Sequence, residues 1–152
     1  MALSVYPWQD GLARDLQALR GRLPNGLLVH GPRGIGTFEL LIRFARSMLC
    51  RAPGPDGEPC GRCKGCAMTA AHTHPDLRYV VSEAECAPRG LPFEPPEGAG
   101  DSRKNLYQDI LIHQPRALQD MLTLTSHSGG RRVIVVYPAD RLRPEAAAPL
   151  LK

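Results

Sequence analysis

Residues 26–50 read GLLVHGPRGIGTFELLIRFARSMLC, and this stretch decides the fold class. A short apolar run between two glycines predicts a buried strand over 26–31. A glycine-rich turn follows, and apolar residues at helical spacing then predict a helix over 37–50. A strand, a glycine-rich turn and a helix, in this order, are typical of the opening of a phosphate-binding α/β domain. The apolar positions of the predicted helix are Leu40, Leu41, Phe44, Met48 and Leu49.

The turn has the two anchoring glycines of a Walker A loop, G-x-x-x-x-G-K-[ST], but lacks its working side chains. Thr37 stands where a lysine contacts the β- and γ-phosphates, and Phe38 stands where a hydroxyl binds Mg²⁺. Arg33 offers a cation at another place in the loop, so we do not expect it to compensate. The sequence therefore predicts a degenerate phosphate loop and no ATP cofactor. Its residues are Gly31, Arg33, Gly34, Gly36, Thr37 and Phe38.

The second half of a nucleotide site would follow the apolar run RRVIVVY at 131–137, which predicts a central buried strand. In a working site such a strand ends in acidic residues that hold Mg²⁺ and orient water. Tyr137 and Pro138 occupy the expected places of that acidic pair. Asp140 lies beyond the strand end, where capping or solvation explains it. We therefore expect no catalytic residue.

A cysteine motif follows the predicted helix, CRAPGPDGEPCGRCKGC over 50–66. The spacing C-x9-C-x2-C-x2-C is typical of a tetrahedral structural zinc site. Two disulfides would need an oxidising compartment, but MALSVYPWQD is not a secretory signal and no apolar run reaches the length of a membrane span. We therefore expect a cytoplasmic protein with no membrane contact that binds zinc, and an iron–sulfur cluster stays open. The expected ligands are Cys50, Cys60, Cys63 and Cys66.

Other candidate ligands and thiols have simpler interpretations. His72 and His74 lie near the cysteines and would bind zinc only if one thiol did not. Cys86 stands alone in a proline-rich stretch and is interpreted as a free surface thiol. The surrounding residues 83–104 are rich in proline, glycine and charge, so they predict a flexible, poorly ordered loop.

The rest of the chain fits an α/β arrangement of about one domain. Asp10 is a candidate N-cap for the first helix, and Gly21 ends it. Pro115 and Pro144 each lie in the first turn of a later helix, although Pro149 lies too deep in the second one. The expected elements are helices over 10–20, 63–72, 115–130 and from 144, with a strand over 77–81.

The charge of the chain is mild and spread out. There are 19 basic and 15 acidic residues, for a net charge of +4, and no run of five or six like charges. With one Trp, four Tyr and three Phe, the chain has little from which to build a base-stacking platform. The composition therefore permits an acidic partner such as nucleic acid without predicting one.

Several motifs together resemble the delta-prime family of bacterial clamp-loader subunits of DNA polymerase III. The motifs are YPW at 6–8, GPRGIG, MLC, CGRCKGC, THPD at 73–76, VIVVYPADRL and the terminal LLK. The resemblance covers essentially the whole chain. It implies an α/β fold of the AAA+ (RecA-like P-loop) class with a parallel sheet, into which a four-cysteine zinc module is inserted after the first helix. The four cysteines fall on the zinc ligands of that family.

The resemblance also implies a domain boundary. The later strands of the family, its trans-acting arginine in a Ser-Arg-Cys motif, its lid and its collar would lie beyond Lys152. Residues 1–152 are therefore expected to be a truncated N-terminal AAA+ domain, which includes the zinc module 50–66 and the flexible loop 83–104.

The function implied by the resemblance is a non-catalytic scaffold, or stator, in the loader that places the sliding clamp on primed DNA for the DNA polymerase III holoenzyme. The implied partners are the gamma/tau and delta subunits, with the sliding clamp and primed DNA reached through the assembly. The implied location is the bacterial cytoplasm, at the nucleoid-associated replisome.

Two other functions stay open. One is a P-loop ATPase of the gamma/tau type, against which Thr37 and Phe38 argue. The other is a zinc-knuckle module that binds nucleic acid. The basic residues of the knuckle permit it, whereas Asp56 and Glu58 dilute their charge.

Overall fold

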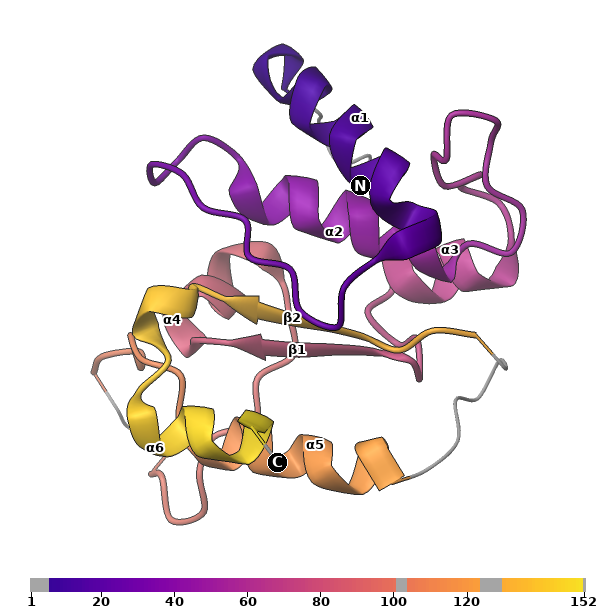
Figure 1. The fold of residues 1–152 in the computed structure, drawn as a ribbon. Coiled ribbons are helices and arrows are strands. Elements are labelled where there is room, and N and C mark those ends of the chain that lie inside the picture. Colours follow the sequence, from indigo (N-terminus) through magenta and orange to yellow (C-terminus); the bar gives the residue numbers. More distant parts are fainter. Residues whose placement is uncertain (1–5, 101–103, 124–129, 152) are drawn as a thin grey trace. The chain divides into compact units, whose positions relative to one another are not determined.

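A computed structural model describes residues 6–100, 104–123 and 130–151 (Figure 1). The chain divides into two compact units, which we call the first and the second unit. Within the described residues, the first unit contains 6–77 and 130–133, and the second contains the remainder. No helix in the described part of the chain combines the length and the apolar character needed to cross a membrane.

Helices build the first unit, as the indigo-to-magenta ribbon of Figure 1 shows. Its core is a cluster of Leu16, Leu40 and Phe44, contributed by the first two α-helices. Partly buried side chains of Ala13, Leu23, Val29 and Met48 pack around that cluster. The elements are η1 (Pro7–Gln9), α1 (Asp10–Ala18), η2 (Leu19–Arg22), α2 (Thr37–Leu49) and α3 (Lys64–Ala70), where η marks a 3-10 helix.

The helices predicted for this unit are present, with shifted ends. The first helix is preceded by the turn η1, so Gln9 rather than Asp10 holds the N-cap position. It also continues past Gly21, because the chain tightens into η2 and ends at Arg22. The predicted helix 37–50 is confirmed as α2, and its apolar stripe faces the core cluster.

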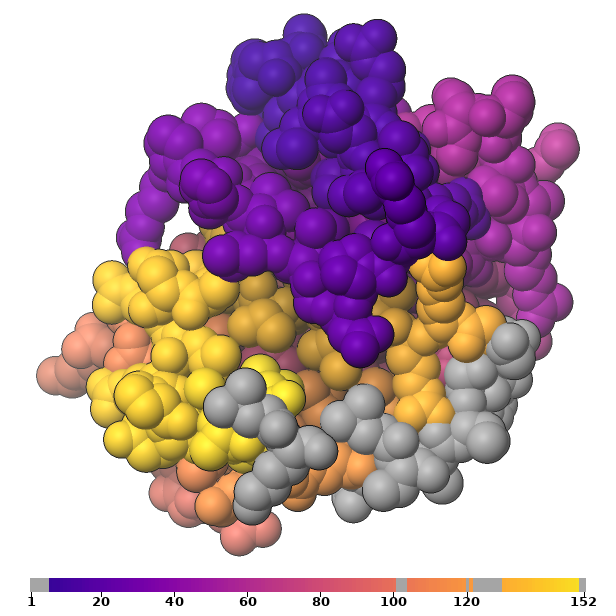
Figure 2. All heavy atoms as spheres, viewed as in Figure 1, coloured from indigo at the N-terminus to yellow at the C-terminus, as the bar shows by residue number. Residues whose placement is uncertain are grey.

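The buried strand predicted over 26–31 is wrong. The segment has no regular structure, and Leu27 and Leu28 are 39% and 73% exposed. Figure 2 shows dark violet atoms of this part of the chain open on the face drawn. A strand needs a neighbour that satisfies its backbone hydrogen bonds. Apart from the first residue of each strand of the sheet, the described part of the first unit contains no strand that could supply them.

The second unit contains the sheet of the described chain. Its strands β1 and β2 run parallel, as the arrows in Figure 1 show, with the Ser82 N–H donating to the Tyr137 carbonyl at 3.2 Å. The core cluster of this unit consists of Val80 on β1 together with Ile110 and Leu118. The elements are β1 (Leu77–Val81), α4 (Glu83–Cys86), η3 (Ala87–Arg89), α5 (His113–Thr123), β2 (Val133–Tyr137), η4 (Ala139–Arg141), α6 (Pro144–Ala147) and η5 (Ala148–Leu151).

Both strands of the sheet were predicted, but the environment of β2 was not. β1 has the predicted bounds, and β2 begins two residues later than expected. Within β2 only Val135 is buried, whereas β1, its single neighbour in the sheet of the described residues, buries Leu77, Val80 and Val81. The interpretation of β2 as a central, fully buried strand is therefore wrong for these residues.

The flexible loop predicted over 83–104 is wrong for its first third. Residues 83–89 form α4 and η3, and the segment is tied to a distant part of the chain. The Glu83 carboxylate accepts from the Tyr107 N–H at 2.9 Å, and the Ala84 N–H donates to the Tyr107 carbonyl at 3.0 Å. The composition of the loop could not reveal these bonds, since their partner lies outside it. Residues 101–103 lie outside the described residues.

The two later helices begin close to the predicted prolines. α5 starts at His113, two residues before Pro115, and the predicted end near Gly129 falls outside the described residues. α6 starts at Pro144 as predicted. It changes to the 3-10 turn η5 at Ala148, so Pro149 does not interrupt an α-helix.

Candidate metal centre and phosphate loop

The four cysteines of the 50–66 motif converge in the first unit. Their Sγ atoms all lie within 4.8 Å of one another. The Cys50 and Cys63 sulfurs are 3.9 Å apart, and the Cys60 and Cys66 sulfurs 4.0 Å apart. Four sulfurs at bond lengths of about 2.3 Å around a tetrahedral zinc ion lie about 3.8 Å from one another. The cluster therefore has the donor set and the size to hold a metal ion.

Local backbone geometry brings these sulfurs together. Cys50 follows the last residue of α2 in an extended conformation, and Cys63 is the N-cap of α3. Gly61 has a φ of 71°, a left-handed conformation that lets the chain turn between Cys60 and Cys63. At Gly65 a Cβ atom would lie 2.5 Å from the Leu49 carbonyl oxygen. Glycine is thus required where α3 approaches the end of α2.

Hydrogen bonds to sulfur favour the thiolate at Cys63, whereas burial favours the thiol at Cys66. The Cys60 N–H donates to the Cys50 sulfur at 3.3 Å, and the Cys66 N–H donates to the Cys63 sulfur at 3.4 Å. Burial alone would raise the pKa of Cys63, but backbone N–H groups of Arg51 and Cys66 lower it to about 6. Burial, together with the neighbouring Cys63 sulfur, raises the pKa of Cys66 to about 12. A cation among the sulfurs favours the ionised form of all four.

Polar contacts fasten the loop 51–59 to the helices. The Arg20 guanidinium donates to the Ser47 carbonyl at 2.8 Å and to the Gly57 carbonyl at 3.2 Å. Arg43 on α2 forms an ion pair of 2.6 Å with Glu58. Sequence reasoning missed these contacts, because nothing in the spacing of Arg20 or Arg43 distinguishes them from other surface arginines. They position the loop that leads to Cys60.

The two histidines near the motif do not join the cluster. Among the described residues, the metal-ligating group contains the four cysteines alone. His74 is buried, and its Nδ1 accepts from the Asp76 N–H at 3.1 Å. Burial lowers the pKa of His74 and also that of His72, which favours the neutral form of each ring.

The loop predicted to be a degenerate phosphate loop lies before α2. Gly36 has a φ of 85° and caps the helix, and its carbonyl accepts from the Leu40 N–H at 3.1 Å. Phe38 is only 5% exposed, so the side chain at the place of the Mg²⁺-binding hydroxyl is buried. Thr37 is partly buried, whereas Gly31, Arg33 and Gly34 are exposed.

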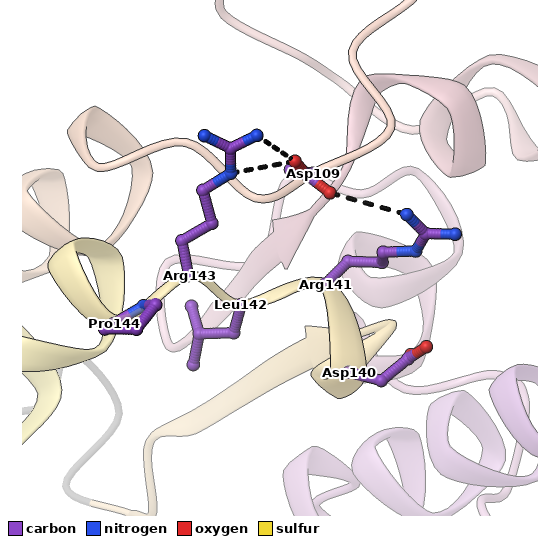
Figure 3. Close-up of a pocket in the computed structure, with 6 residues that line it drawn as sticks. All are labelled: Asp109, Asp140, Arg141, Leu142, Arg143 and Pro144. Atoms are coloured by element: carbon purple, nitrogen blue, oxygen red, sulfur yellow. Dashed lines mark hydrogen bonds and ion pairs between the residues drawn. The ribbon is translucent and has the colours of Figure 1, made fainter.

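The residues expected at the second half of a nucleotide site lie in the second unit. Tyr137 and Pro138 end β2, and the Arg89 guanidinium lies 5.3 Å from the centre of the Tyr137 ring. Asp140 is exposed on η4 and lines a shallow pocket of about 390 Å³ (Figure 3). Within that pocket Asp109 binds two arginines, Arg143 at 2.6 and 2.8 Å and Arg141 at 3.6 Å.

Comparison with known proteins gives long matches. The chain is 36% identical over 148 residues to the DNA polymerase III subunit delta' of Pseudomonas aeruginosa and 30% identical over 151 residues to that of Escherichia coli. Each match covers 97% of this chain and 38% of the relative. A DNA polymerase III subunit gamma/tau of Mycobacterium bovis is 36% identical over 64 residues, which are 42% of this chain and 11% of that relative.

The chain therefore spans less than two fifths of the length of the delta' relatives that it matches. A family model described as DNA polymerase III, delta subunit, matches residues 9–152. These matches confirm the resemblance inferred from the sequence motifs. The chain belongs to the DNA polymerase III delta subunit family represented by that model.

Proposed function

We propose that residues 1–152 are the N-terminal AAA+ domain of a delta-prime clamp-loader subunit, which supports the assembly without hydrolysing ATP. Family membership and the names of the delta' relatives support the assignment to DNA polymerase III and to DNA replication. The glycine-containing loop that leads into α2 supports the AAA+ assignment, and so does the parallel pairing of β1 and β2.

The role proposed for the metal is structural. The four sulfurs would hold one zinc ion as thiolates, and the ion would supply a cross-link between the end of α2 and the start of α3. Four thiolates fill a tetrahedral shell, so no position is left for a water molecule or a substrate. The contacts of Arg20 and Arg43 hold the intervening loop, so the module forms a rigid extension of the helices.

Phe38 is the observation that carries the non-catalytic assignment. Magnesium needs a hydroxyl from this position and a carboxylate from the end of the second strand. A buried phenyl ring supplies no ligand, and Tyr137–Pro138 supply no carboxylate. Thr37 carries no charge for the β- and γ-phosphates. Since these elements act as a unit in phosphoryl transfer, the loss of all of them removes turnover.

The proposed partners are the gamma/tau and delta subunits of a clamp loader in the bacterial cytoplasm, at the nucleoid-associated replisome. The sliding clamp and primed DNA would be reached through that assembly. The absence of a basic tract and the small number of aromatic residues favour protein partners over direct DNA binding. The gamma/tau match over 64 residues supports a common architecture with those subunits.

Single-turnover ATP hydrolysis tests the non-catalytic role. The wild-type chain and Thr37→Lys are both expected to show no magnesium-dependent hydrolysis, because Phe38 and Tyr137–Pro138 still withhold the metal ligands. Arg33→Lys is a matched control that places a lysine elsewhere in the loop. Magnesium-dependent turnover by the wild type, with contaminating ATPases excluded, would overturn the proposal.

Co-purification tests the partner assignment. The complete protein is expected to retain gamma/tau and delta subunits at physiological salt. The 152-residue chain is expected to show no tight DNA binding in a fluorescence anisotropy titration under the same conditions. Tight, sequence-tolerant DNA binding by this chain would favour the zinc-knuckle alternative instead.

A further inference from the structure

The segment that precedes α1 makes unusual contacts with the phosphate loop. The Trp8 indole N–H donates to the Ile35 carbonyl at 3.1 Å, and the Gln9 side-chain amide donates to the same oxygen at 2.6 Å. One carbonyl of the loop therefore accepts from two consecutive side chains. The separations in sequence are 27 and 26 residues, so this is a tertiary contact and not a local turn.

A third residue of this segment covers the next position of the loop. At Gly36 a Cβ atom would lie 2.5 Å from Cδ2 of the Tyr6 ring and 2.8 Å from Nε2 of Gln9. The Tyr6 ring also stacks on Trp8, with ring centroids 4.7 Å apart and planes inclined by 11°. Tyr6 and Gln9 thus occupy the space beside the glycine that caps α2.

The segment is itself held in shape. The Gln9 N–H donates to the Tyr6 carbonyl at 2.9 Å, which closes the turn η1. Gln9 is buried, whereas Trp8 is 66% exposed. Because the Trp8 ring is exposed, it does not fill the apolar core. Its N–H bond to the Ile35 carbonyl helps to position the loop instead.

We infer that residues 6–9 form an intramolecular clamp, which holds the phosphate loop through the Ile35 carbonyl and covers Gly36. The clamp fixes the loop without a bound nucleotide. The contacts of residues 6–9 do not depend on the assignment of the chain to a clamp loader. The interpretation that they help to exclude a nucleotide rests on the proposed function. Ile35 adds to the closure, because its side chain lies against Gly31 at the other end of the loop.

The single tryptophan of this sequence makes the clamp directly observable. In the 152-residue chain, one indole N–H signal is expected in the proton–nitrogen NMR spectrum. Because it is bonded to Ile35, its hydrogen exchange should be at least about tenfold slower than that of free tryptophan. Exchange at the rate of free tryptophan would overturn the inference.

Two variants separate the contacts of the clamp. Gln9→Leu removes the buried donor at similar volume, and Trp8→Phe removes the indole N–H while it keeps the stack on Tyr6. Hydrogen exchange of peptides that cover 31–40 should become about tenfold faster in Gln9→Leu and about threefold faster in Trp8→Phe. The matched control is Leu12→Ala, which removes an apolar side chain that is 44% exposed on the adjoining helix.

The clamp would be contradicted if hydrogen exchange of 31–40 were unchanged in both variants. It would also be contradicted if Leu12→Ala accelerated that exchange as much as they do. Trp8→Phe keeps the test valid if Gln9→Leu does not fold, since it alters an exposed side chain. Titration with Mg²⁺·ATP separates this inference from the proposed function. ATP binding by the wild type would contradict the proposal that the chain works without a nucleotide. Hydrogen exchange in 31–40 at the wild-type rate in both variants would contradict the intramolecular clamp and leave the proposed function untouched.

Discussion

The two units differ in charge and in the interactions that hold them together. In the sequence of the first unit, 1–77 and 130–133, there are eleven basic and six acidic residues, which give a net charge of +5. The second unit has eight basic and nine acidic residues, which give a net charge of −1. The four clustered cysteines belong to the first unit. The second unit is organised by a parallel sheet and its apolar cluster. The mild charge of the whole chain therefore conceals a strongly uneven distribution.

The difference shows two ways to stabilise a small structure. The first unit joins its helices through a cysteine cluster and arginine contacts to backbone carbonyls. The second relies on side chains such as Val80 and Ile110, which have no exposed surface. The first unit has an apolar cluster of its own, but within 50–66 the buried hydrophobic residues are Cys50 and Cys66 alone, and a segment of this kind commonly depends on a metal or another cross-link. We expect metal loss to affect the first unit far more than the second.

The largest effect is expected for Cys63→Ser. Loss of one thiolate from a four-thiolate site should weaken zinc binding by at least about a hundredfold, as measured by competition with a chromophoric chelator. Hydrogen exchange should accelerate in 50–66 and at the end of α2, but not in β1 or β2. The control is Cys86→Ser, which changes a cysteine outside the cluster and should leave zinc binding intact. If Cys63→Ser accelerated hydrogen exchange equally in both units, the expectation that the metal stabilises mainly the first unit would be wrong.

Ile110→Ala is the reverse test, because it perturbs the second unit. Ile110 has no exposed surface and packs in the cluster with Val80 and Leu118. Its truncation should lower the free energy of unfolding by about 3 kcal/mol in urea denaturation. Zinc affinity should not change. Ile112→Ala, at a 37% exposed position nearby, should cost less than about 1 kcal/mol. A similar cost at both positions would mean that burial does not stabilise this unit.

Arg20→Met tests whether arginine contacts stabilise the first unit. The variant keeps the apolar stem but loses the bonds to the Ser47 and Gly57 carbonyls. The expected cost in unfolding free energy is about 1–2 kcal/mol, with faster hydrogen exchange in 51–59. Arg14→Met removes an exposed guanidinium whose Nε bonds only one turn back, to the Asp10 carbonyl at 3.2 Å, and should cost much less. Equal effects would show that the loop is not fastened by Arg20.

The stability of the second unit is expected to fall at high pH because of Cys86. Burial raises the pKa of this thiol from 9.0 to about 11. Between these values the unfolded chain ionises while the folded chain keeps its proton, so stability present below pH 9 is lost as the pH approaches 11. The loss should be at most about 2.7 kcal/mol, measured as the change across that range in the difference between wild type and Cys86→Ala. A constant difference between the two proteins would refute it.

Asp109→Asn should have the smallest effect. Asp109 pairs with Arg143 and Arg141, but the arginine side chains are 67% and 43% exposed. Exposed ion pairs contribute about 0.2–1 kcal/mol and are weakened by salt. The loss on substitution should therefore shrink in thermal denaturation as ionic strength rises. A salt-independent loss of more than about 2 kcal/mol would assign Asp109 a larger structural role.

The predictions that agree with the structure were drawn from short-range patterns in the sequence. The spacing of the four cysteines and the apolar period of α2 are local, and the structure places both as expected. β1 was also found, because Pro75–Asp76 interrupts the chain directly before it. The start of α2 after Gly36 was predicted from a local pattern as well, whereas the assignment of the preceding loop to a phosphate site stays a prediction.

Predictions that depended on distant partners were the ones that failed. The strand over 26–31 lacks a pairing neighbour in the described part of the first unit, and no local pattern reports that. Cys86 was interpreted as a surface thiol, but it is buried, and its sulfur lies 3.6 Å from the Val81 carbonyl. Its proline-rich surroundings suggested exposure, whereas Tyr107 ties that segment down from elsewhere in the chain. Contacts of this kind cannot be derived from spacing.

The order of the two units along the chain has a consequence for synthesis on the ribosome. Every cysteine of the cluster, together with α1, α2 and α3, precedes the first strand, whereas β2 begins at Val133. A nascent chain thus exposes all four sulfurs before either strand of the sheet can pair. We expect a ribosome-arrested chain that ends after residue 100 to capture zinc already, and protection of its cysteines from alkylation during translation would test this order of assembly.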